Sequence, residues 1–260
     1  IGTHYTQMAS NGITWEVATK DDLGIDLSLF NDKFTATVDY FHEKRTGTFL
    51  TREFLPDITG LESKPKANVG EVKSQGFDGN FALKQKLGEV DMTIRGNITY
   101  SKNEVLEKDE ENQVYSYLYQ KGYRVDQVKG LIAEGLFADY DDIRTSPKQE
   151  FGTVQPGDIK YKDVNNDGVI NSNDMIPMGY STAWPEIYYG FNVGLEWRGI
   201  GFNAYFQGVS NYTALLNSSI YRPLINNTSI SQYAYDNRWT PENPSARFPR
   251  LTTEAVENNT

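Results

Sequence analysis

The sequence predicts an all-β fold: a segment of an antiparallel transmembrane β-barrel with about six to seven strands and long extracellular loops. Two observations predict it. Amphipathic strands are joined alternately by very short turns and by long polar stretches, which is the layout of outer-membrane barrels. Aromatic residues also cluster near both ends of these strands, as they do where barrel strands cross the two membrane interfaces.

Each strand is identified by alternation with a period of two residues. The first hairpin alternates apolar residues with polar or small ones over Leu23–Phe30 and Phe34–Phe41, with Asn31, Asp32 and Lys33 between them. The second does so over Phe77–Lys84 and Val90–Tyr100, around a turn at Leu87, Gly88 and Glu89. The third covers Tyr189–Trp197 and Ile200–Gln207, joined by Arg198 and Gly199.

Alternation gives every strand one apolar and one polar face. In a barrel the apolar face meets lipid and the polar face lines the lumen. In a soluble antiparallel sandwich the apolar face meets a core instead, and alternation alone does not separate the two folds. The unequal loop lengths and the aromatic clusters favour the barrel.

The long connections are Glu43–Gln75, Ser101–Ile187 and the chain after Val209. Loops of this length inside a compact domain are usually functional or disordered. We expect Gln113–Phe137, in which apolar residues are interrupted by glycines, to fold as short helices or turns packed on the barrel mouth.

Composition excludes several function classes. The net charge of −10 argues against a nucleic-acid partner. The absence of cysteine excludes disulfide scaffolds, cysteine-ligated zinc and thiol catalysis. No segment approaches the roughly 18 consecutive apolar residues of a transmembrane helix, whereas barrel strands need only about 9–11 residues.

The sharpest chemical motif is Asp163–Asp174, which has the spacing of an EF-hand calcium loop. Calcium prefers hard oxygen ligands, and Gly168 stands where the loop must turn sharply. The predicted ligands are Asp163, Asn165, Asp167, the carbonyl of Val169, and Asp174. Asp174 replaces the usual bidentate glutamate, and the alternative is an Asx-rich turn without metal. A bound Ca2+ would be structural and would stiffen the loop.

Several stretches resemble the C-terminal barrel region of SusC/RagA-type TonB-dependent outer-membrane transporters of Bacteroidetes. The stretches that carry the resemblance are Ile13–Glu16, Asp22–Asp26, Val38–Phe41, Ala67–Val72, Gln75–Phe77, Gln155–Gly179, Pro185–Asn192, Arg238–Pro244 and Phe248–Leu251. They occur in order across nearly the whole chain, so together they are far more specific than any one alone.

The resemblance implies a barrel of about 22 strands with an N-terminal plug, located in the bacterial outer membrane. It implies import of oligosaccharides or peptides, energised by TonB through an N-terminal region and assisted by a SusD-like surface lipoprotein. The chain starts without Met or a signal peptide. We therefore expect a fragment that lacks the plug, the TonB box and the closing strands. Substrate residues in the family follow no fixed motif, so none is assigned.

Two other function classes compete with this interpretation. One is a soluble extracellular carbohydrate-binding module with a dockerin-like calcium loop, although a dockerin has two such loops and the sequence contains one. The other is a glycan-degrading enzyme, for which no catalytic carboxylate pair can be named. We therefore expect no catalytic residues, no cofactor-binding residues and no enzymatic activity.

Overall fold

The computed structural model describes residues 10, 12–55, 63–218, 221–224, 228–254 and 256–259. The chain forms two compact units. The first, called the sheet unit, comprises residues 1–113, 119–128 and 179–213, and the second, called the loop unit, comprises residues 114–118, 129–178 and 214–260.

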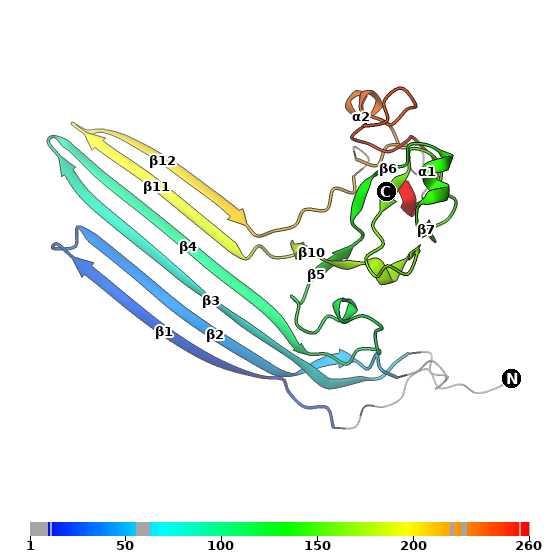
Figure 1. Cartoon of the computed structure of the whole chain (residues 1–260). Coiled ribbons are helices and arrows are strands. Elements are labelled where there is room, and N and C mark those ends of the chain that lie inside the picture. Colours follow the sequence, from blue (N-terminus) through cyan, green and yellow to red (C-terminus); the bar gives the residue numbers. More distant parts are fainter. Residues whose placement is uncertain are drawn as a thin grey trace. The chain divides into compact units, whose positions relative to one another are not determined.

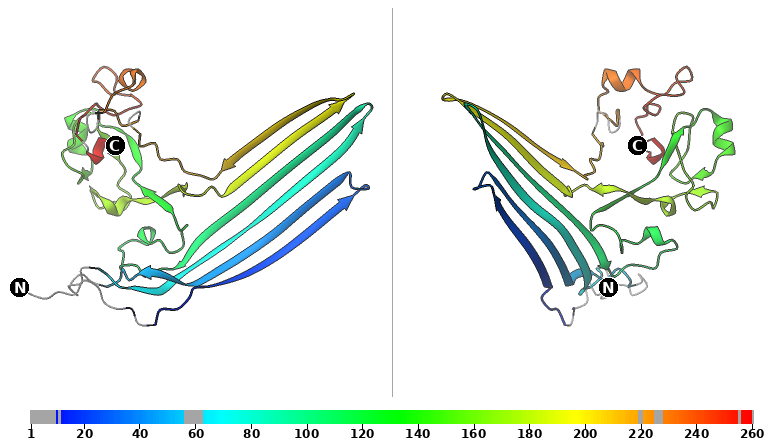
Figure 2. Two further views of the ribbon diagram at one scale, coloured as in Figure 1. Left: turned by 180° about the vertical axis from the view of Figure 1, so that it is seen from behind. Right: turned by 60° about the vertical axis from the view of Figure 1, so that its left-hand side comes forward.

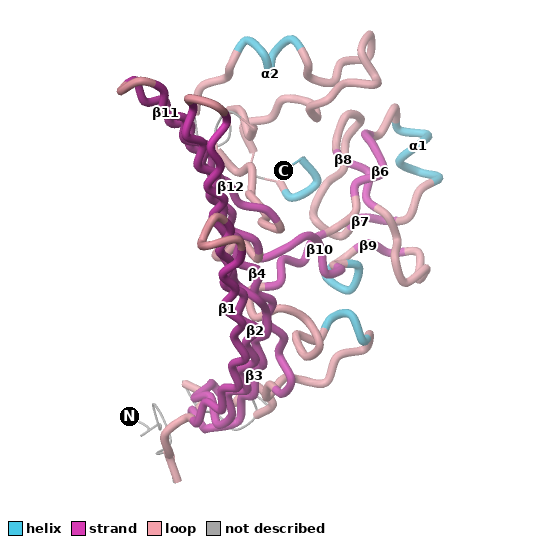
Figure 3. The backbone as a smooth tube through the Cα atoms, turned by 90° about the vertical axis from the view of Figure 1, so that its left-hand side faces the viewer, coloured by secondary structure: helices cyan, strands magenta, loops and turns pink. Residues whose placement is uncertain are grey.

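The sheet unit is built around one antiparallel sheet of six strands, which confirms the predicted fold class. In spatial order these are β1 (Val17–Leu29), β2 (Phe34–Thr51), β3 (Lys66–Leu87), β4 (Val90–Glu107), β11 (Ile187–Trp197) and β12 (Ile200–Ser210). Figure 1 shows β1 and β12 at the two edges of the sheet, and Figure 2 shows its twist from two other sides. Seen nearly edge-on in Figure 3, the strands form a single layer.

The three predicted hairpins are present with the predicted turns. Arg198 and Gly199 both have positive φ, of 48° and 83°. Two consecutive residues in this region form the turn whose twist matches that of the flanking strands. The Glu89 carboxylate, in the turn between β3 and β4, accepts hydrogen bonds from Arg198 Nε at 2.8 Å and Nη2 at 2.9 Å. The guanidinium lowers the pKa of Glu89.

The strands run further toward the long loops than the sequence predicted. β2 and β3 remain paired as far as Thr51 and Lys66, well beyond the last apolar alternation. Polar side chains facing each other across strands also stabilise pairing. Lys73 and Glu104, for example, form an ion pair of 2.9 Å between β3 and β4. The predicted boundaries were too short because they followed hydrophobic alternation alone.

The apolar face of the sheet is exposed. Leu23 on β1, Ile200 on β12 and Phe206 on β12 are 69%, 67% and 60% exposed. The buried apolar side chains of the described residues are Val105, Phe137, Tyr161, Ile170, Ala234 and Phe248, and all except Val105 lie in the loop unit. The sheet therefore has no sandwich core, and its apolar face is suited to lipid.

The long connections contain short elements. They are η2 (Ser116–Leu118), β5 (Gln127–Gly130), β6 (Ala133–Leu136), α1 (Tyr140–Thr145), β7 (Lys148–Gln149), β8 (Ile159–Tyr161), β9 (Val169–Ile170), η3 (Ser172–Asp174), β10 (Ile176–Ser181), α2 (Gln232–Asp236) and η5 (Glu257–Asn259). β10 pairs with β5, β6 with β8, and β7 with β9. The expectation of only helices or turns in Gln113–Phe137 was wrong for β5 and β6. In the described part of the chain, no helix has the length and apolarity that a membrane crossing requires.

A buried polar junction holds the loop unit together. Asp158 is 0% exposed, and its Oδ1 accepts hydrogen bonds from Arg250 Nε at 2.7 Å and Asn259 Nδ2 at 2.9 Å. Gly157 beside it has a φ of +86°, and a Cβ there would lie 2.4 Å from the Trp239 ring. The junction brings together Asp158 and Arg250, which are 92 positions apart and belong to two of the stretches that carry the family resemblance.

Candidate functional site

The predicted calcium loop, Asp163–Asp174, follows β8 in the loop unit and contains β9 and η3. Asn166 and Gly168 have positive φ, of 58° and 83°, which gives the sharp turn that the motif requires. Val169 lies in β9, which pairs in parallel with Lys148 of β7. The loop is thus anchored to a strand pair on one side and to a 3-10 helix on the other.

Three of the five predicted ligand residues turn their oxygens toward backbone N–H groups of the loop itself. Asp163 Oδ2 accepts from Gly168 N at 2.8 Å. Asn165 Oδ1 accepts from Asp167 N at 2.9 Å, and Asp167 Oδ1 accepts from Val169 N at 2.8 Å. These bonds form a compact turn without help from any ligand, so they fit both the metal and the Asx-turn interpretations.

Asp174, the fourth side chain, is fully buried. Its Oδ1 accepts from Val164 N at 2.8 Å and its Oδ2 from Asn171 N at 2.9 Å. With the Asn171 side chain it completes a capping box at the start of η3. Asp174 therefore fixes the closure of the loop, a role that the spacing pattern did not reveal.

One oxygen of the loop lacks a partner. Asp163 Oδ1 is buried and makes no hydrogen bond among the described residues. A buried carboxylate oxygen without a donor is unfavourable, and a cation is one way to satisfy it. Within the described ranges, however, no three His, Cys, Asp or Glu side chains are grouped closely enough to hold a metal ion. The oxygen donors and the orphaned Asp163 Oδ1 fit calcium, whereas the spacing of the acidic side chains does not form a metal cluster among the described residues.

Tyr117 packs beside this loop. Its hydroxyl donates to the Asn173 carbonyl at 2.7 Å, and its ring stacks on Tyr115 with centroids 5.4 Å apart. Burial raises the pKa of Tyr117, and the nearby carboxylate of Asp174 adds to the effect. The two rings brace the loop, which agrees with a role in packing.

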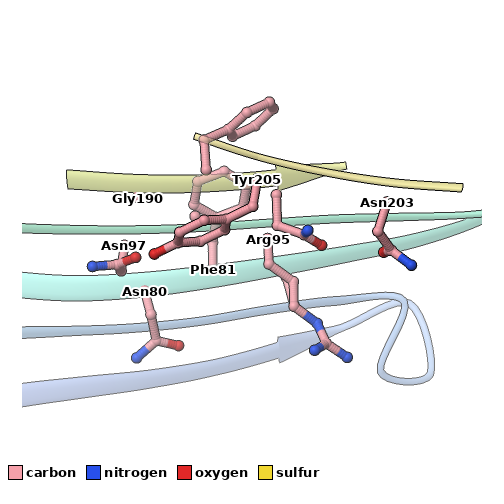
Figure 4. Close-up of a pocket in the computed structure, with 11 residues that line it drawn as sticks. Asn80, Phe81, Arg95, Asn97, Gly190, Asn203 and Tyr205 are labelled. Carbon is pink, nitrogen blue, oxygen red and sulfur yellow. The ribbon is translucent and has the colours of Figure 1, made fainter. Parts of the chain in front are cut away.

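A second candidate site lies on the polar face of the sheet. It is a hollow of 680 Å³ over β3, β4, β11 and β12. Its side-chain polar groups come from Asn80, Arg95, Asn97, Asn192, Asn203 and Tyr205. Figure 4 shows Asn80, Arg95 and Asn203 projecting on one side of the strands, with the Tyr205 hydroxyl directed toward Asn97.

Glycine makes the hollow possible. A Cβ at Gly190 would lie 2.5 Å from Asn97 Oδ1 and 3.2 Å from the Tyr205 hydroxyl. A Cβ at Gly194 would lie 2.8 Å from Asn203 Oδ1. These two positions of β11 therefore leave room for the side chains of the neighbouring strands.

None of the residues in the hollow was singled out from the sequence. Alternation did place Arg95 and Asn97 on the polar face of one strand, and Asn192 on that of another. The missing information was the pairing of β4 with β11, in which Arg95 lies opposite Asn192. These residues are separated by a long connection, and no local pattern shows that their strands are neighbours.

Comparison with known proteins gives a consistent result. Residues 3–184 match the family described as TonB dependent receptor-like, beta-barrel. TonB-dependent receptor P26 of Formosa agariphila is 27% identical over 258 residues, which cover 94% of this chain and 25% of that protein. TonB-dependent receptor P3 of the same organism is 23% identical over 269 residues, covering 96% and 26%. The chain thus spans about a quarter of the length of these relatives.

Solved structures show the same fold. The RagAB peptide importer in its "open-open" state matches with a TM-score of 0.68 at 16% identity, over 95% of this chain and 26% of that one. The structure of the RagAB peptide transporter matches with a TM-score of 0.64 at 18% identity, over 92% and 26%. The family match, the relatives and this shared fold together confirm the family resemblance inferred from the sequence motifs.

Proposed function

Because the chain belongs to the TonB-dependent receptor-like β-barrel family, whose members are outer-membrane proteins, we propose that it supplies wall strands and extracellular loops of a nutrient importer. The observation that carries this proposal is the two-faced sheet. One face exposes apolar side chains such as Leu23 and Ile200, and the other carries polar groups such as Asn97 and Arg95. Such a sheet suits a wall between lipid and an aqueous lumen.

The proposed cargo is an oligosaccharide or a peptide, and the proposed partners are TonB and a SusD-like surface lipoprotein. The likeness to the RagAB peptide importer supports this assignment, because it extends over nearly the whole chain. The proposed role is passage and recognition, with no catalytic step. A soluble carbohydrate-binding module would leave the exposed apolar face of the sheet without an explanation.

The test is gentle detergent extraction of the full-length parent from outer membranes, followed by mass spectrometry of the proteins that co-purify. We expect the parent in the outer-membrane fraction together with a surface lipoprotein, whose binding specificity would indicate the cargo. A parent that is soluble in buffer and purifies alone would contradict the importer.

We also propose that Ca2+ binds Asp163–Asp174 and braces this loop. Asp163, Asn165, Asp167, the Val169 carbonyl and Asp174 would hold the ion. The orphaned Oδ1 of Asp163 supports the proposal, since a cation would satisfy it. The ion would supply only cross-linking of the loop, because a full shell of protein oxygens leaves no position for chemistry.

Chelation should therefore loosen this loop. In the full-length parent in outer-membrane vesicles, EGTA should increase protease cleavage within residues 163–174, and added Ca2+ should reverse the effect. Asp163→Ala is the matched control, because it should be cleaved readily with or without EGTA. Equal cleavage of the unmodified receptor in both conditions would show that no metal braces the loop.

A further inference from the structure

The hollow on the polar face contains an unpaired guanidinium. Arg95 of β4 lies between Ala82 of β3 and Asn192 of β11, and Tyr205 of β12 follows Asn192 across the sheet. Arg95 forms no ion pair or hydrogen bond through its side chain within the described part of the chain. The small Ala82 on one side leaves the guanidinium open to the hollow.

A second cation stands next to it. Lys84 of β3 lies opposite Thr93, one step along the strands from Arg95 and on the same face. Its side chain is exposed and likewise has no partner among the described residues. Other cations of this face are paired: Lys20 with Glu43 at 3.1 Å, and Lys86 with Asp91 at 3.3 Å.

The three rows that hold these two cations contain no carboxylate, whereas Asp78, Asp91 and Glu196 lie in the adjoining rows of the same face. On the polar face, three successive rows cross β3, β4, β11 and β12. They are Asn80–Asn97–Gly190–Gln207, Ala82–Arg95–Asn192–Tyr205 and Lys84–Thr93–Gly194–Asn203. We call these twelve positions the cationic patch. It carries two positive charges and no negative one, although the whole chain has a net charge of −10.

The neutral members of the patch can donate hydrogen bonds. The amides of Asn80, Asn97 and Asn203 and the hydroxyl of Tyr205 make no side-chain hydrogen bond within the described residues. A guanidinium offers two parallel N–H groups that match the two oxygens of a carboxylate. Amide and hydroxyl donors at the rim would complete its coordination.

From this juxtaposition we propose that the cationic patch is a lumenal subsite for a carboxylate group of the transported cargo. Arg95 and Lys84 supply the charge, and Asn97, Asn203 and Tyr205 supply neutral donors. The subsite would favour acidic peptides or uronate-containing oligosaccharides over neutral cargo. This inference rests on the proposed importer function, because only then does the polar face line the path of the cargo.

The test measures the local potential with charged thiol reagents, since the chain itself has no cysteine. Asn97→Cys is introduced into the full-length receptor in outer-membrane vesicles, with any other cysteine of the parent replaced. Its modification rate is measured with the anionic sulfonatoethyl and the cationic trimethylammonioethyl methanethiosulfonates. Arg95→Gln with Lys84→Gln should lower the anionic-to-cationic rate ratio about five- to tenfold at moderate salt. Lys86→Gln, which removes a paired cation nearby, should change the ratio less than about twofold.

Protection of the Asn97→Cys thiol by added peptides tests whether the cationic patch binds carboxylate groups. Hexaglutamate should slow modification of Asn97→Cys, whereas hexaglutamine should not, and the double substitution should abolish the difference. Equal protection by both peptides, protection by neither, or a ratio unaffected by the double substitution would overturn the inference. A cysteine unreactive to both reagents would show that another part of the parent fills the hollow, which also overturns it. If the unmodified receptor is absent from the outer membrane, the proposed function itself fails.

Discussion

Replacing Asp158 by alanine should destabilise the loop unit by about 3–5 kcal/mol, the typical cost of removing one partner of a buried ion pair. The Asp158 carboxylate is fully buried and accepts hydrogen bonds from Arg250, Asn259 and the Gln155 backbone. Its removal leaves the mostly buried Arg250 guanidinium without its acceptor. Limited proteolysis of the full-length receptor in vesicles measures the loss of stability of the loop unit, because cleavage follows the population of the locally open state.

The matched control is Asp141→Asn. Asp141 also forms an ion pair, with Arg144 at 2.9 Å, but both side chains are about three-quarters exposed. Exposed pairs contribute at most about 1 kcal/mol, so cleavage should change little. If Asp158→Ala and Asp141→Asn are equally resistant, the junction at Asp158 is not what holds the loop unit together.

Replacing Val193 by arginine should impair membrane insertion or folding by about 2–4 kcal/mol, the cost of a cation at the lipid-facing midplane of a barrel. Val193 lies midway along β11, on the face that also exposes Phe191 and Leu195. The fraction of full-length receptor that folds in the outer membrane, read from heat-modifiable gel mobility, and its urea midpoint measure the effect.

Gln207→Arg adds the same charge to the opposite face. Gln207 lies on β12 across from Gly190, on the polar side of the sheet. A cation there remains in the aqueous lumen, so the folded fraction should stay close to that of the unmodified receptor. Equal damage from the two substitutions would contradict the assignment of lipid and lumen faces.

The hairpins could be predicted from sequence because the residues that define each one are close together in the chain. A short turn such as Arg198–Gly199 and strict alternation on both sides fix which residues face each other and which face is apolar. The pairing of β4 with β11 could not be predicted in this way, since no local pattern shows which strands become neighbours across a connection as long as residues 108–186. The hollow at Arg95 depends on that pairing and was missed for the same reason.

In the loop unit, prediction from the sequence was limited for a different reason. β7 and β9 contain two residues each, too few for a periodic pattern. The spacing of Asp163–Asp174 correctly predicted the turn at Gly168 but not the positive φ of Asn166 or the capping role of Asp174. Likewise, the burial of Asp158 depends on Arg250 and Asn259, which approach from the far end of the chain.

Single cysteines along β11 test most directly whether this sheet separates lipid from an aqueous lumen. Spin labels at positions 190 to 196 of the full-length receptor in outer membranes would be compared for collision with lipid-soluble oxygen and with a water-soluble nickel chelate. Labels replacing Phe191, Val193 and Leu195 should collide mostly with oxygen, and labels at the positions between them should do so far less. Labels at these three positions that are shielded from both agents, as in the core of a sandwich, would contradict it.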